Sequence, residues 1–386
     1  MEWNTVKLGD IVRRKIGYGI VQPGESRPCG VPVIKVNNII AGLTSVDDLE
    51  KTTEEIECKY QRTRLQGGEL IISLVGSVGN TAIVPKSFKG CNLVRATGLI
   101  DIEDPFLTKW VKYYIDSPLG QYYIKSNLNT TVQATLNVKS LVDMPIPMPD
   151  SRIIGQIVAV LSSLDDKIEN NNRINANLEA QAQALFKSWF VDFEPWGGTM
   201  PEDWREGVLS DIADITMGQS PRGESYNTQG EGVIFYQGCS DFGDRFPSVR
   251  MFTTEPARYA VPNSILMSVR APVGTMNVAL EECCIGRGLA SLKEKNSYDS
   301  FLLYLLESLQ NVFDSYNGDG TVFGSINKKS IGNIKIVIPS IKVVESFHKM
   351  VSPLDEKIKF NHQESARLAA LRDTLLPKLM KGEIKV

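Results

Sequence analysis

One stretch, in which apolar or small residues recur at alternating steps of four and three, constrains this chain most. It runs from Ile153 to about Phe190 and is interrupted by two polar positions, Asn171 and Asn175. Such a repeat is typical of a long helix with one narrow apolar stripe, which needs a second helix to cover it. At 1.5 Å per residue the helix would reach roughly 55 Å, which is too long for one side of a small domain.

The chain repeats this pattern 190 positions later, with its polar interruption at Asn361. The local sequence also repeats, as Leu164-Asp165-Asp166-Lys167-Ile168 and Leu354-Asp355-Glu356-Lys357-Ile358. If the helices pack antiparallel with Asn171 facing Asn361, the layers on either side are apolar, and the polar layer fixes the register. The predicted seam consists of Ile157, Leu161, Leu164, Ile168, Asn171, Leu178, Leu185, Phe347, Leu354, Ile358, Asn361, Leu368 and Leu375.

Charge agrees with this pairing. Residues 153–194 carry three basic and six acidic side chains, whereas residues 341–386 carry nine basic and six acidic ones. The alternative is two unrelated amphipathic helices, each packed on its own domain. One departure separates the copies: Pro377 stands where the first helix has Lys187, so we expect the second helix to end or kink near Leu376.

A globular block precedes each helix, and the two blocks share landmarks. Apolar runs bounded by glycine predict buried strands at 69–75 and 264–270, and further strands are expected at 93–102 and 284–292. Helices are expected at 106–115 and about 298–313. We therefore predict an α+β fold: two similar mixed α/β domains separated by a long antiparallel two-helix coiled coil, with a pseudo-twofold internal duplication. The predicted bounds are 1–150 and 201–339 for the domains, 151–193 for the central spacer helix, 194–200 for a linker, and 340–386 for the C-terminal helix and tail.

Composition excludes several classes of protein. The 386 residues carry a net charge of −3, and no apolar run reaches membrane-spanning length. The N-terminus lacks a signal-peptide pattern, and the six cysteines form no CxxC pair, so we expect a reduced, cytoplasmic protein without structural zinc. There is no phosphate-binding loop, no dinucleotide fingerprint and no methyltransferase signature, and only two histidines are present. These absences favour a binding protein over an enzyme.

Polar loops near the end of each block are the best candidates for a binding site. They are rich in Thr, Gln, Asn, Ser and Lys, the side chains that contact phosphate oxygens and base edges, and arginines at strand ends could reach guanine. The alternative is that these are ordinary turn residues and solvated charges. The predicted DNA-binding residues are Thr131, Gln133, Asn137, Lys139, Arg95, Thr321, Ser325, Lys328, Lys329, Arg270 and Arg287.

The duplicated layout resembles the specificity subunit of a type I restriction–modification system. The likeness is carried by the paired Leu-Asp-(Asp/Glu)-Lys-Ile helices, the exits Pro145–Pro149 and Ile336–Ser340, the ending Leu375–Ile384, and the Met217–Pro221 turn. The first copy departs from that turn, with Gly17-Tyr18-Gly19-Ile20 nearby.

The resemblance implies that each block is a target recognition domain that reads half of a split DNA target. The coiled coil would set the gap and dock two methyltransferase subunits, which would bind S-adenosylmethionine and methylate a flipped adenine. ATP and Mg would belong to endonuclease subunits, so no cofactor, metal or catalytic residue is expected in this chain. The rival hypotheses are a scaffold that binds proteins rather than DNA, an enzyme with an unrecognised carboxylate site, and a subunit of a modification-only complex.

Overall fold

The computed structural model of the chain describes residues 3–130, 133–318 and 324–384. The chain divides into two compact units, each of which combines one globular block with part of each long helix. Unit 1 comprises Met1–Asn170 and Glu364–Val386, and unit 2 comprises Asn171–Gln363. The domain bounds expected from the sequence stay a prediction, because this division cuts through both helices instead of separating them from the blocks.

The two long helices are α6, Ser151–Phe190, and α11, Ile341–Met380, and each has 40 residues. Asp150 precedes α6, and its Oδ1 accepts a hydrogen bond from the backbone N of Arg152 at 2.8 Å, which satisfies a donor at the exposed helix start. Of the two outcomes expected near Leu376, an end of α11 is wrong, since the helix continues through Pro377 to Met380, whereas a kink there stays a prediction. Leu376, Leu379 and Met380 are buried in the core of unit 1, and their burial offsets the helix bond that proline removes.

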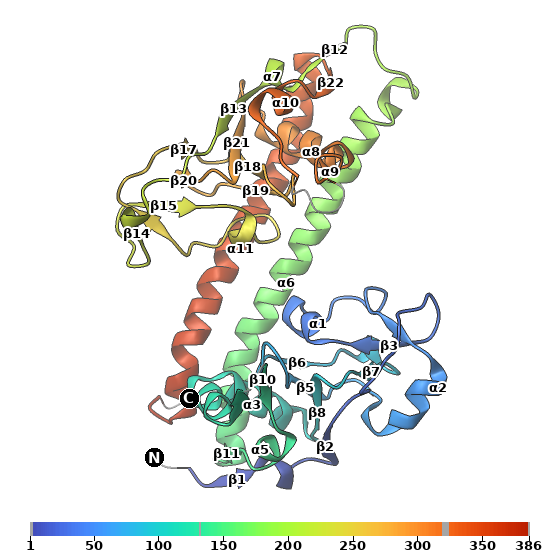
Figure 1. The fold of residues 1–386 in the computed structure, drawn as a ribbon, viewed down its shortest axis with the longest axis vertical. Coiled ribbons are helices and arrows are strands. Elements are labelled where there is room, and N and C mark those ends of the chain that lie inside the picture. The colour runs from blue at the N-terminus through green and yellow to red at the C-terminus, as the bar shows by residue number, and fades with distance from the viewer. Residues whose placement is uncertain (1–2, 131–132, 319–323, 385–386) are drawn as a thin grey trace. The chain divides into compact units, whose positions relative to one another are not determined.

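The helices pack antiparallel in each unit (Figure 1). In unit 1, Lys167 Nζ lies 3.0 Å from Glu364 Oε2, while Asp165, earlier on α6, pairs with Arg372, later on α11, at 2.8 Å. In unit 2 the order is the same, because Phe186, late on α6, contacts Phe347, early on α11. The antiparallel coiled coil predicted from the sequence is therefore confirmed.

The asparagines of the polar layer make more hydrogen bonds than a single Asn171–Asn361 pair would. Asn171 and Asn361 are both fully buried, and the Asn171 amide donates to the backbone carbonyl of Asn361 at 3.5 Å. The Asn361 amide instead donates to Oδ1 of Asn175 at 2.8 Å, and Asn175 Nδ2 donates to the Ile358 carbonyl at 3.4 Å. Every residue of the predicted seam is buried or half-buried.

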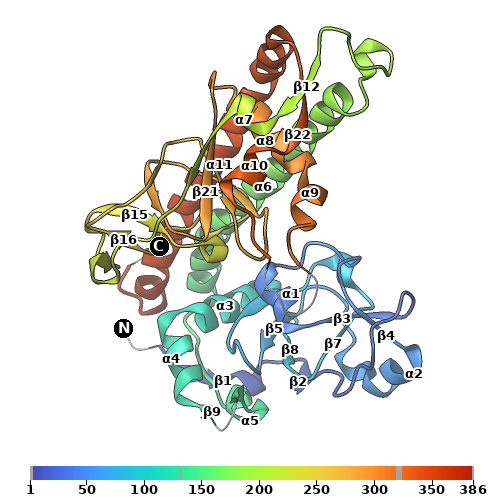
Figure 2. The same ribbon diagram turned by 45° about the horizontal axis from the view of Figure 1, so that its top comes forward.

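The block in unit 1 contains a four-stranded antiparallel sheet in the order β2-β8-β5-β6 and a three-stranded sheet in the order β4-β3-β7 (Figure 2). Two small antiparallel pairs, β1 with β11 and β9 with β10, complete the strands. The strands are β1 Thr5–Lys7, β2 Arg14–Tyr18, β3 Val31–Ile34, β4 Lys51–Thr52, β5 Leu70–Ser73, β6 Thr81–Ile83, β7 Asn92–Leu93, β8 Thr97–Asp101, β9 Leu128–Thr130, β10 Ala134–Leu136 and β11 Pro145–Pro147. The helices are α1 Val36–Ala41, α2 Glu54–Glu57, α3 Pro105–Asp116, α4 Pro118–Ser126 and α5 Val138–Val142.

The block in unit 2 repeats the order of the four-stranded sheet, and its second sheet repeats the three-stranded one with an added strand at each edge. Its four-stranded sheet has the order β13-β21-β18-β19, its second sheet has the order β14-β16-β15-β20-β17, and β12 pairs with β22 as β1 pairs with β11. The strands are β12 Arg205–Val208, β13 Ala213–Met217, β14 Tyr226–Asn227, β15 Val233–Tyr236, β16 Phe252–Thr253, β17 Tyr259–Ala260, β18 Ile265–Ser268, β19 Met276–Val278, β20 Cys283–Ile285, β21 Leu289–Glu294 and β22 Lys335–Ile338. The helices are α7 Leu209–Ile212, α8 Asp299–Ser308, α9 Gln310–Asp314 and α10 Lys328–Gly332. This shared order confirms the duplication.

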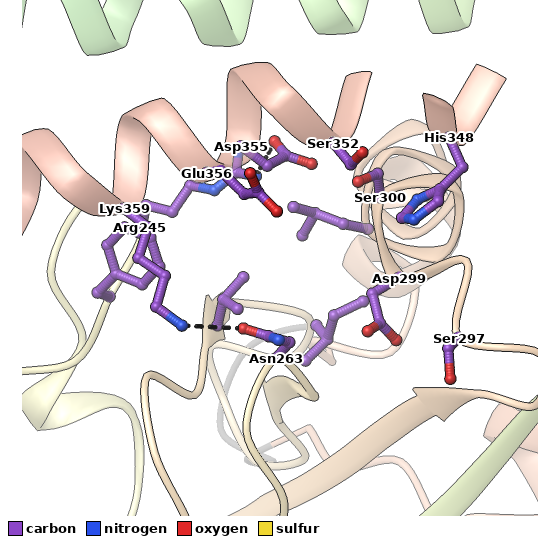
Figure 3. Close-up of a pocket in the computed structure, with 14 residues that line it drawn as sticks. Arg245, Asn263, Ser297, Asp299, Ser300, His348, Ser352, Asp355, Glu356 and Lys359 are labelled. Atoms are coloured by element: carbon purple, nitrogen blue, oxygen red, sulfur yellow. Dashed lines mark hydrogen bonds and ion pairs between the residues drawn. The ribbon is translucent and has the colours of Figure 1, made fainter. Parts of the chain in front are cut away.

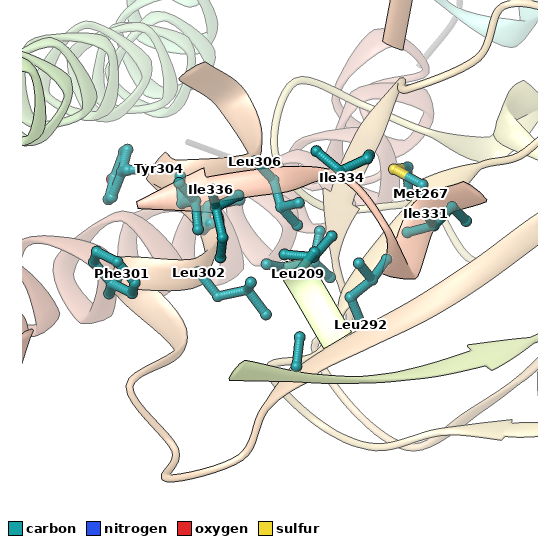
Figure 4. Packing of buried hydrophobic residues seen from close by; sticks show 14 of the residues in the cluster. Leu209, Met267, Leu292, Phe301, Leu302, Tyr304, Leu306, Ile331, Ile334 and Ile336 are labelled. Atoms are coloured by element: carbon teal, nitrogen blue, oxygen red, sulfur yellow. The ribbon is translucent and has the colours of Figure 1, made fainter. Parts of the chain in front are cut away.

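The helix after the four-stranded sheet provides much of the core in each unit. In unit 1, Asp104 caps α3 by accepting a hydrogen bond from the Phe106 N at 2.8 Å, and Pro105 occupies the first turn. Trp110 on this helix is fully buried, and its indole N–H donates to the Pro147 carbonyl at 2.8 Å. In unit 2, Phe301, Leu302 and Leu306 of α8 pack in a cluster with residues of the sheet and of α10 (Figure 4).

The expected strands at 93–102 and 284–292 are each two strands. β7 pairs in parallel with β3 and β8 pairs with β5, and likewise β20 pairs in parallel with β15 and β21 pairs with β18. The chain therefore passes from one sheet to the other at a turn. Arg95 lies in that turn in unit 1 and Arg287 in unit 2.

Candidate nucleic-acid interface

The polar loop of each block is attached to the end of a central strand by the same backbone contacts. In unit 1, the Gly76 N donates to the Ala134 carbonyl at 3.0 Å, and the Leu136 N donates to the Leu74 carbonyl at 2.8 Å. Val75 and Thr135 form an antiparallel bridge between these two bonds. Backbone bonds of this kind hold the loop at the strand end whatever side chains it carries.

Unit 2 reproduces this attachment bond for bond. The Ala271 N donates to the Gly324 carbonyl at 3.1 Å, the Ile326 N donates to the Val269 carbonyl at 3.0 Å, and Arg270 bridges Ser325. Two residues of the predicted site, Arg270 and Ser325, are thus neighbours across the bridge. At the equivalent positions unit 1 has Val75 and Thr135, so the same scaffold presents different side chains.

A buried serine hydroxyl holds the turn that follows each central strand. Ser73 Oγ donates to the Ser77 carbonyl at 2.6 Å and accepts a hydrogen bond from the Asn80 N at 2.9 Å. Ser268 Oγ makes the same two contacts, with the Pro272 carbonyl at 2.5 Å and the Thr275 N at 3.0 Å. These bonds satisfy polar groups that would otherwise be costly to bury, so the turn is well defined in both units.

A third segment in each unit is bonded to the strand that ends where the chain passes from one sheet to the other. In unit 1 the Ile20 N donates to the Leu93 carbonyl at 2.7 Å, and in unit 2 the Gln219 N donates to the Ile285 carbonyl at 2.9 Å. The residue before each of these is a glycine, and a Cβ there would lie 1.9 Å from the Leu93 O at Gly19 and 2.2 Å from the Gly286 O at Gly218. Only glycine permits this close approach. The Gly19 turn is therefore the counterpart of the Gly218 turn, despite their different sequences.

The predicted DNA-binding residues that the structure describes are all exposed at the surface of their blocks: Gln133, Asn137, Lys139 and Arg95 in unit 1, and Ser325, Lys328, Lys329, Arg270 and Arg287 in unit 2. Thr131 and Thr321 lie outside the described residues. Asn137 has a structural role as well, because its Oδ1 accepts a hydrogen bond from the Lys139 N at 3.2 Å and caps α5. Lys328 and Lys329 lie on α10, whose cap is the corresponding Asn327.

A hollow of about 440 Å³ in unit 1 brings part of this set together. Arg95 and Asn137 both line it, with Tyr18, Asn129 and Thr135. Gln133 and Lys139 are not among its lining residues. Tyr18 and Asn129 are not among the DNA-binding residues predicted from the sequence. Tyr18 could have been selected because it ends a strand and precedes Gly19, the glycine that packs against the Leu93 carbonyl.

The three arginines keep their guanidinium groups available for a ligand. Arg95, Arg270 and Arg287 form no ion pair with another described residue, whereas Arg14, for example, lies 2.7 Å from Glu69 Oε1. A guanidinium has five donors in a planar fork that matches guanine O6 and N7 or a phosphate. The backbone of Arg287 is held in its turn, because its N–H donates to Ser220 Oγ at 3.3 Å.

A metal-ligating cluster and a membrane-spanning helix are both absent from the part of the chain that the structure describes. Its His, Cys, Asp and Glu side chains form no group of three or more that could hold a metal ion. None of its helices combines the length and apolar content needed to cross a membrane.

Comparison with known proteins identifies the scaffold. The model of one family, the type I restriction modification DNA specificity domain, matches residues 1–180 and again 201–370. The chain belongs to this family. The two matches coincide with the two copies of the duplication. As a specificity subunit, the chain has a non-catalytic, DNA-recognition role in a type I restriction–modification system.

Relatives of this specificity subunit are similar over most of its length. It is 29% identical over 407 residues to a putative type I restriction enzyme MjaX specificity subunit from Methanocaldococcus jannaschii, covering 100% of this chain and 94% of the relative. It is 25% identical over 336 residues to the HindI specificity subunit from Haemophilus influenzae, covering 67% and 73%. The crystal structure of a type I specificity subunit from M. genitalium has the same fold, with a TM-score of 0.59 at 18% identity over 98% of this chain and 96% of that one.

Proposed function

We propose that each globular block of this subunit reads one part of a two-part DNA sequence. What carries the proposal is that two identical backbone frameworks, each built from a strand end, a polar loop and an arginine turn, present different exposed side chains. A shared framework with divergent surface residues is what two readers of different sequences require. Arg95 and Arg287 would contact guanine edges or phosphates, and the amides of Gln133 and Asn137 would contact adenine or the backbone.

We further propose that the paired helices fix the length of the gap between the two parts and dock two methyltransferase subunits. Those partners would carry S-adenosylmethionine and transfer its methyl group to adenine, and ATP-dependent, Mg-containing endonuclease subunits would join them for restriction. Such a complex would act on DNA in the cytoplasm.

The deciding experiment is to co-express the chain with its modification subunit and map methylated adenines across the host genome. The expected result is one motif made of two short specific parts separated by a gap of fixed length. Methylation without a two-part motif would overturn the proposal.

One alternative, a scaffold that binds only proteins, is tested by gel retardation with the modification subunit present. Duplexes containing the mapped motif should compete better than duplexes of scrambled sequence. Equal competition by both would favour the scaffold.

A further inference from the structure

The repeated Leu-Asp-(Asp/Glu)-Lys-Ile segments contain a contact that both units share. In unit 1, the Tyr113 hydroxyl of α3 donates to Asp165 Oδ2 of α6 at 2.6 Å. In unit 2, the Tyr304 hydroxyl of α8 donates to Asp355 Oδ1 of α11 at 2.7 Å. The aspartates occupy the same position of the repeat, and each tyrosine lies on the helix that follows the four-stranded sheet of its block. Each bond therefore joins a globular block to a long helix.

Both tyrosines are buried, with 4% of Tyr113 and 1% of Tyr304 exposed. Burial raises the pKa of both hydroxyls, and the nearby aspartate raises them further, so each tyrosine remains a protonated donor. A partly buried hydrogen bond to a charged acceptor is among the stronger polar contacts, and it requires a particular orientation of donor and acceptor.

The second partner of each aspartate differs between the units. Asp165 also accepts from Arg372 of α11 at 2.8 Å, which ties helix to helix. Asp355 accepts from Arg245 of the globular block at 2.5 Å, and Arg245 also reaches Glu179 at 3.0 Å. Because the arginines come from unrelated positions, the tyrosine–aspartate bond is the part of the arrangement that the duplication has in common.

Packing beside the bond in unit 2 is incomplete. A cavity of about 340 Å³ lies between α11 and the block, lined on one side by His348, Ser352 and Lys359 and on the other by Asn263 and Asp299 (Figure 3). Lys359 Nζ crosses it to donate to Asn263 Oδ1 at 3.2 Å. Since apolar packing does not fill this part of the junction, directed polar contacts contribute there to restraining the angle of the block.

We propose that the Tyr113–Asp165 and Tyr304–Asp355 bonds are positioning contacts that hold each block at a fixed angle on its helix and so determine how strictly gap length is discriminated. This inference rests on the proposed function. Adding one base pair to the gap moves the second half-site by roughly 3.4 Å and rotates it by roughly 35° about the DNA axis. A block that can rock by a comparable angle accepts the wrong gap, although it still reads the same bases.

The test compares Tyr113→Phe, Tyr304→Phe and the double variant with wild type, each co-expressed with the modification subunit. The quantity measured is the fraction of adenines methylated at genomic sites with the correct gap, relative to sites whose gap is one base pair longer or shorter. We expect this ratio to fall roughly tenfold in each single variant and further in the double variant, while both half-site sequences stay unchanged.

Tyr114→Phe is the matched control, because Tyr114 is the next residue of α3, is also buried, and its hydroxyl donates to no described residue. It should leave the ratio at the wild-type value. The thermal midpoint of each variant is measured as well. If Tyr304→Phe does not accumulate, Tyr113→Phe decides the question, since the two bonds are equivalent.

The outcomes distinguish a failure of the proposed function from a failure of the positioning role of the tyrosines. A wild-type complex without a two-part motif overturns the proposed function and this inference together. A wild-type two-part motif with an unchanged gap ratio in the tyrosine variants overturns the inference alone, even where the thermal midpoint falls. A change in the half-site sequences would also overturn it, because the tyrosines would then act as readers and not as positioning residues.

Discussion

Two arginines in the turns between the two sheets are the residues that we most expect to contact DNA. Arg95 and Arg287 occupy equivalent turns, are exposed, and form no ion pair with another described residue. Their guanidinium groups are therefore not committed to the fold. The same cannot be said of Asn137, whose side chain caps α5, so a substitution there would mix a stability effect with a binding effect.

Arg95→Ala is expected to weaken recognition of one half-site only, and Arg287→Ala the other. Loss of a bidentate contact to a base should cost about 1–3 kcal/mol of discrimination at one position. Methylation motifs of the variant complexes measure this directly. Arg205→Ala is the control, because Arg205 lies on β12 and pairs with Asp211 at 3.3 Å. Equal losses at both half-sites in either variant would contradict the assignment.

Glu307 on α8 is expected to make the stability of the protein depend on pH. Burial raises its pKa to about 7, and Gln183 and Arg245 only partly oppose this shift. Because the folded state holds the proton more tightly than the unfolded state, the contribution of Glu307 to stability is greatest below the ordinary pKa of 4.5 and is lost as pH rises through about 7.

Glu307→Gln should therefore raise the thermal midpoint at pH 8 and change it little at pH 5, as measured by calorimetry across that range. Glu345→Gln is the opposing control, since Lys349 lowers the pKa of Glu345, and its removal should cost stability at pH 8. A midpoint for Glu307→Gln that falls at pH 8 would contradict the assignment.

At the scale of elements, the second half of α6 and the first part of α11 are held by an aromatic cluster. Phe347 is fully buried, with ring centroids 5.7 Å from Phe186 and 5.1 Å from Phe190. The same ring lies 6.5 Å from Phe301 of α8, so it links both long helices to the globular block of unit 2. The position therefore serves the coiled coil and the domain core at once.

Phe347→Ala is expected to destabilise unit 2 by about 3–5 kcal/mol, because it leaves a cavity where three elements meet. Chemical unfolding monitored by tryptophan fluorescence should report the loss, since Trp189 lies 6.1 Å from the same ring. Phe360→Ala, on the same helix but 54% exposed, is the control and should change stability by less than about 0.5 kcal/mol. Similar effects of the two substitutions would argue against this packing.

At the scale of the whole molecule, the duplication has preserved backbone contacts and changed surface side chains. The loop attachments at Val75 and Arg270, and the tyrosine–aspartate bonds, recur in both units, whereas exposed residues beside them differ. From the loops onward the offset between the copies stays at 190, which keeps the two helices at 40 residues each. A constant helix length is what a spacer function needs.

Inserting one heptad into both helices at equivalent positions should lengthen the gap of the methylated motif without altering either half-site. Seven residues add roughly 10 Å of helix and keep the apolar seam in register. The motif of the variant complex, mapped as for wild type, measures the outcome. An altered half-site with an unchanged gap would count against the spacer.

The sequence by itself determined the duplication, the antiparallel helix pair and the polar layer, because a 4-3 repeat and its register are local patterns that recur at a fixed offset. It could not determine that the strands expected at 93–102 and 284–292 divide between two sheets. β7 pairs in parallel with β3, and β20 with β15, both of which are distant in sequence. This pairing separates β7 from β8 and β20 from β21, and it leaves Arg95 and Arg287 exposed in the turns between them. The continuation of α11 past Pro377 and the selection of Tyr113 and Tyr304 likewise depend on burial against distant residues. Local patterns fix which segments are helices, and only the tertiary structure decides which side chains those segments bring together.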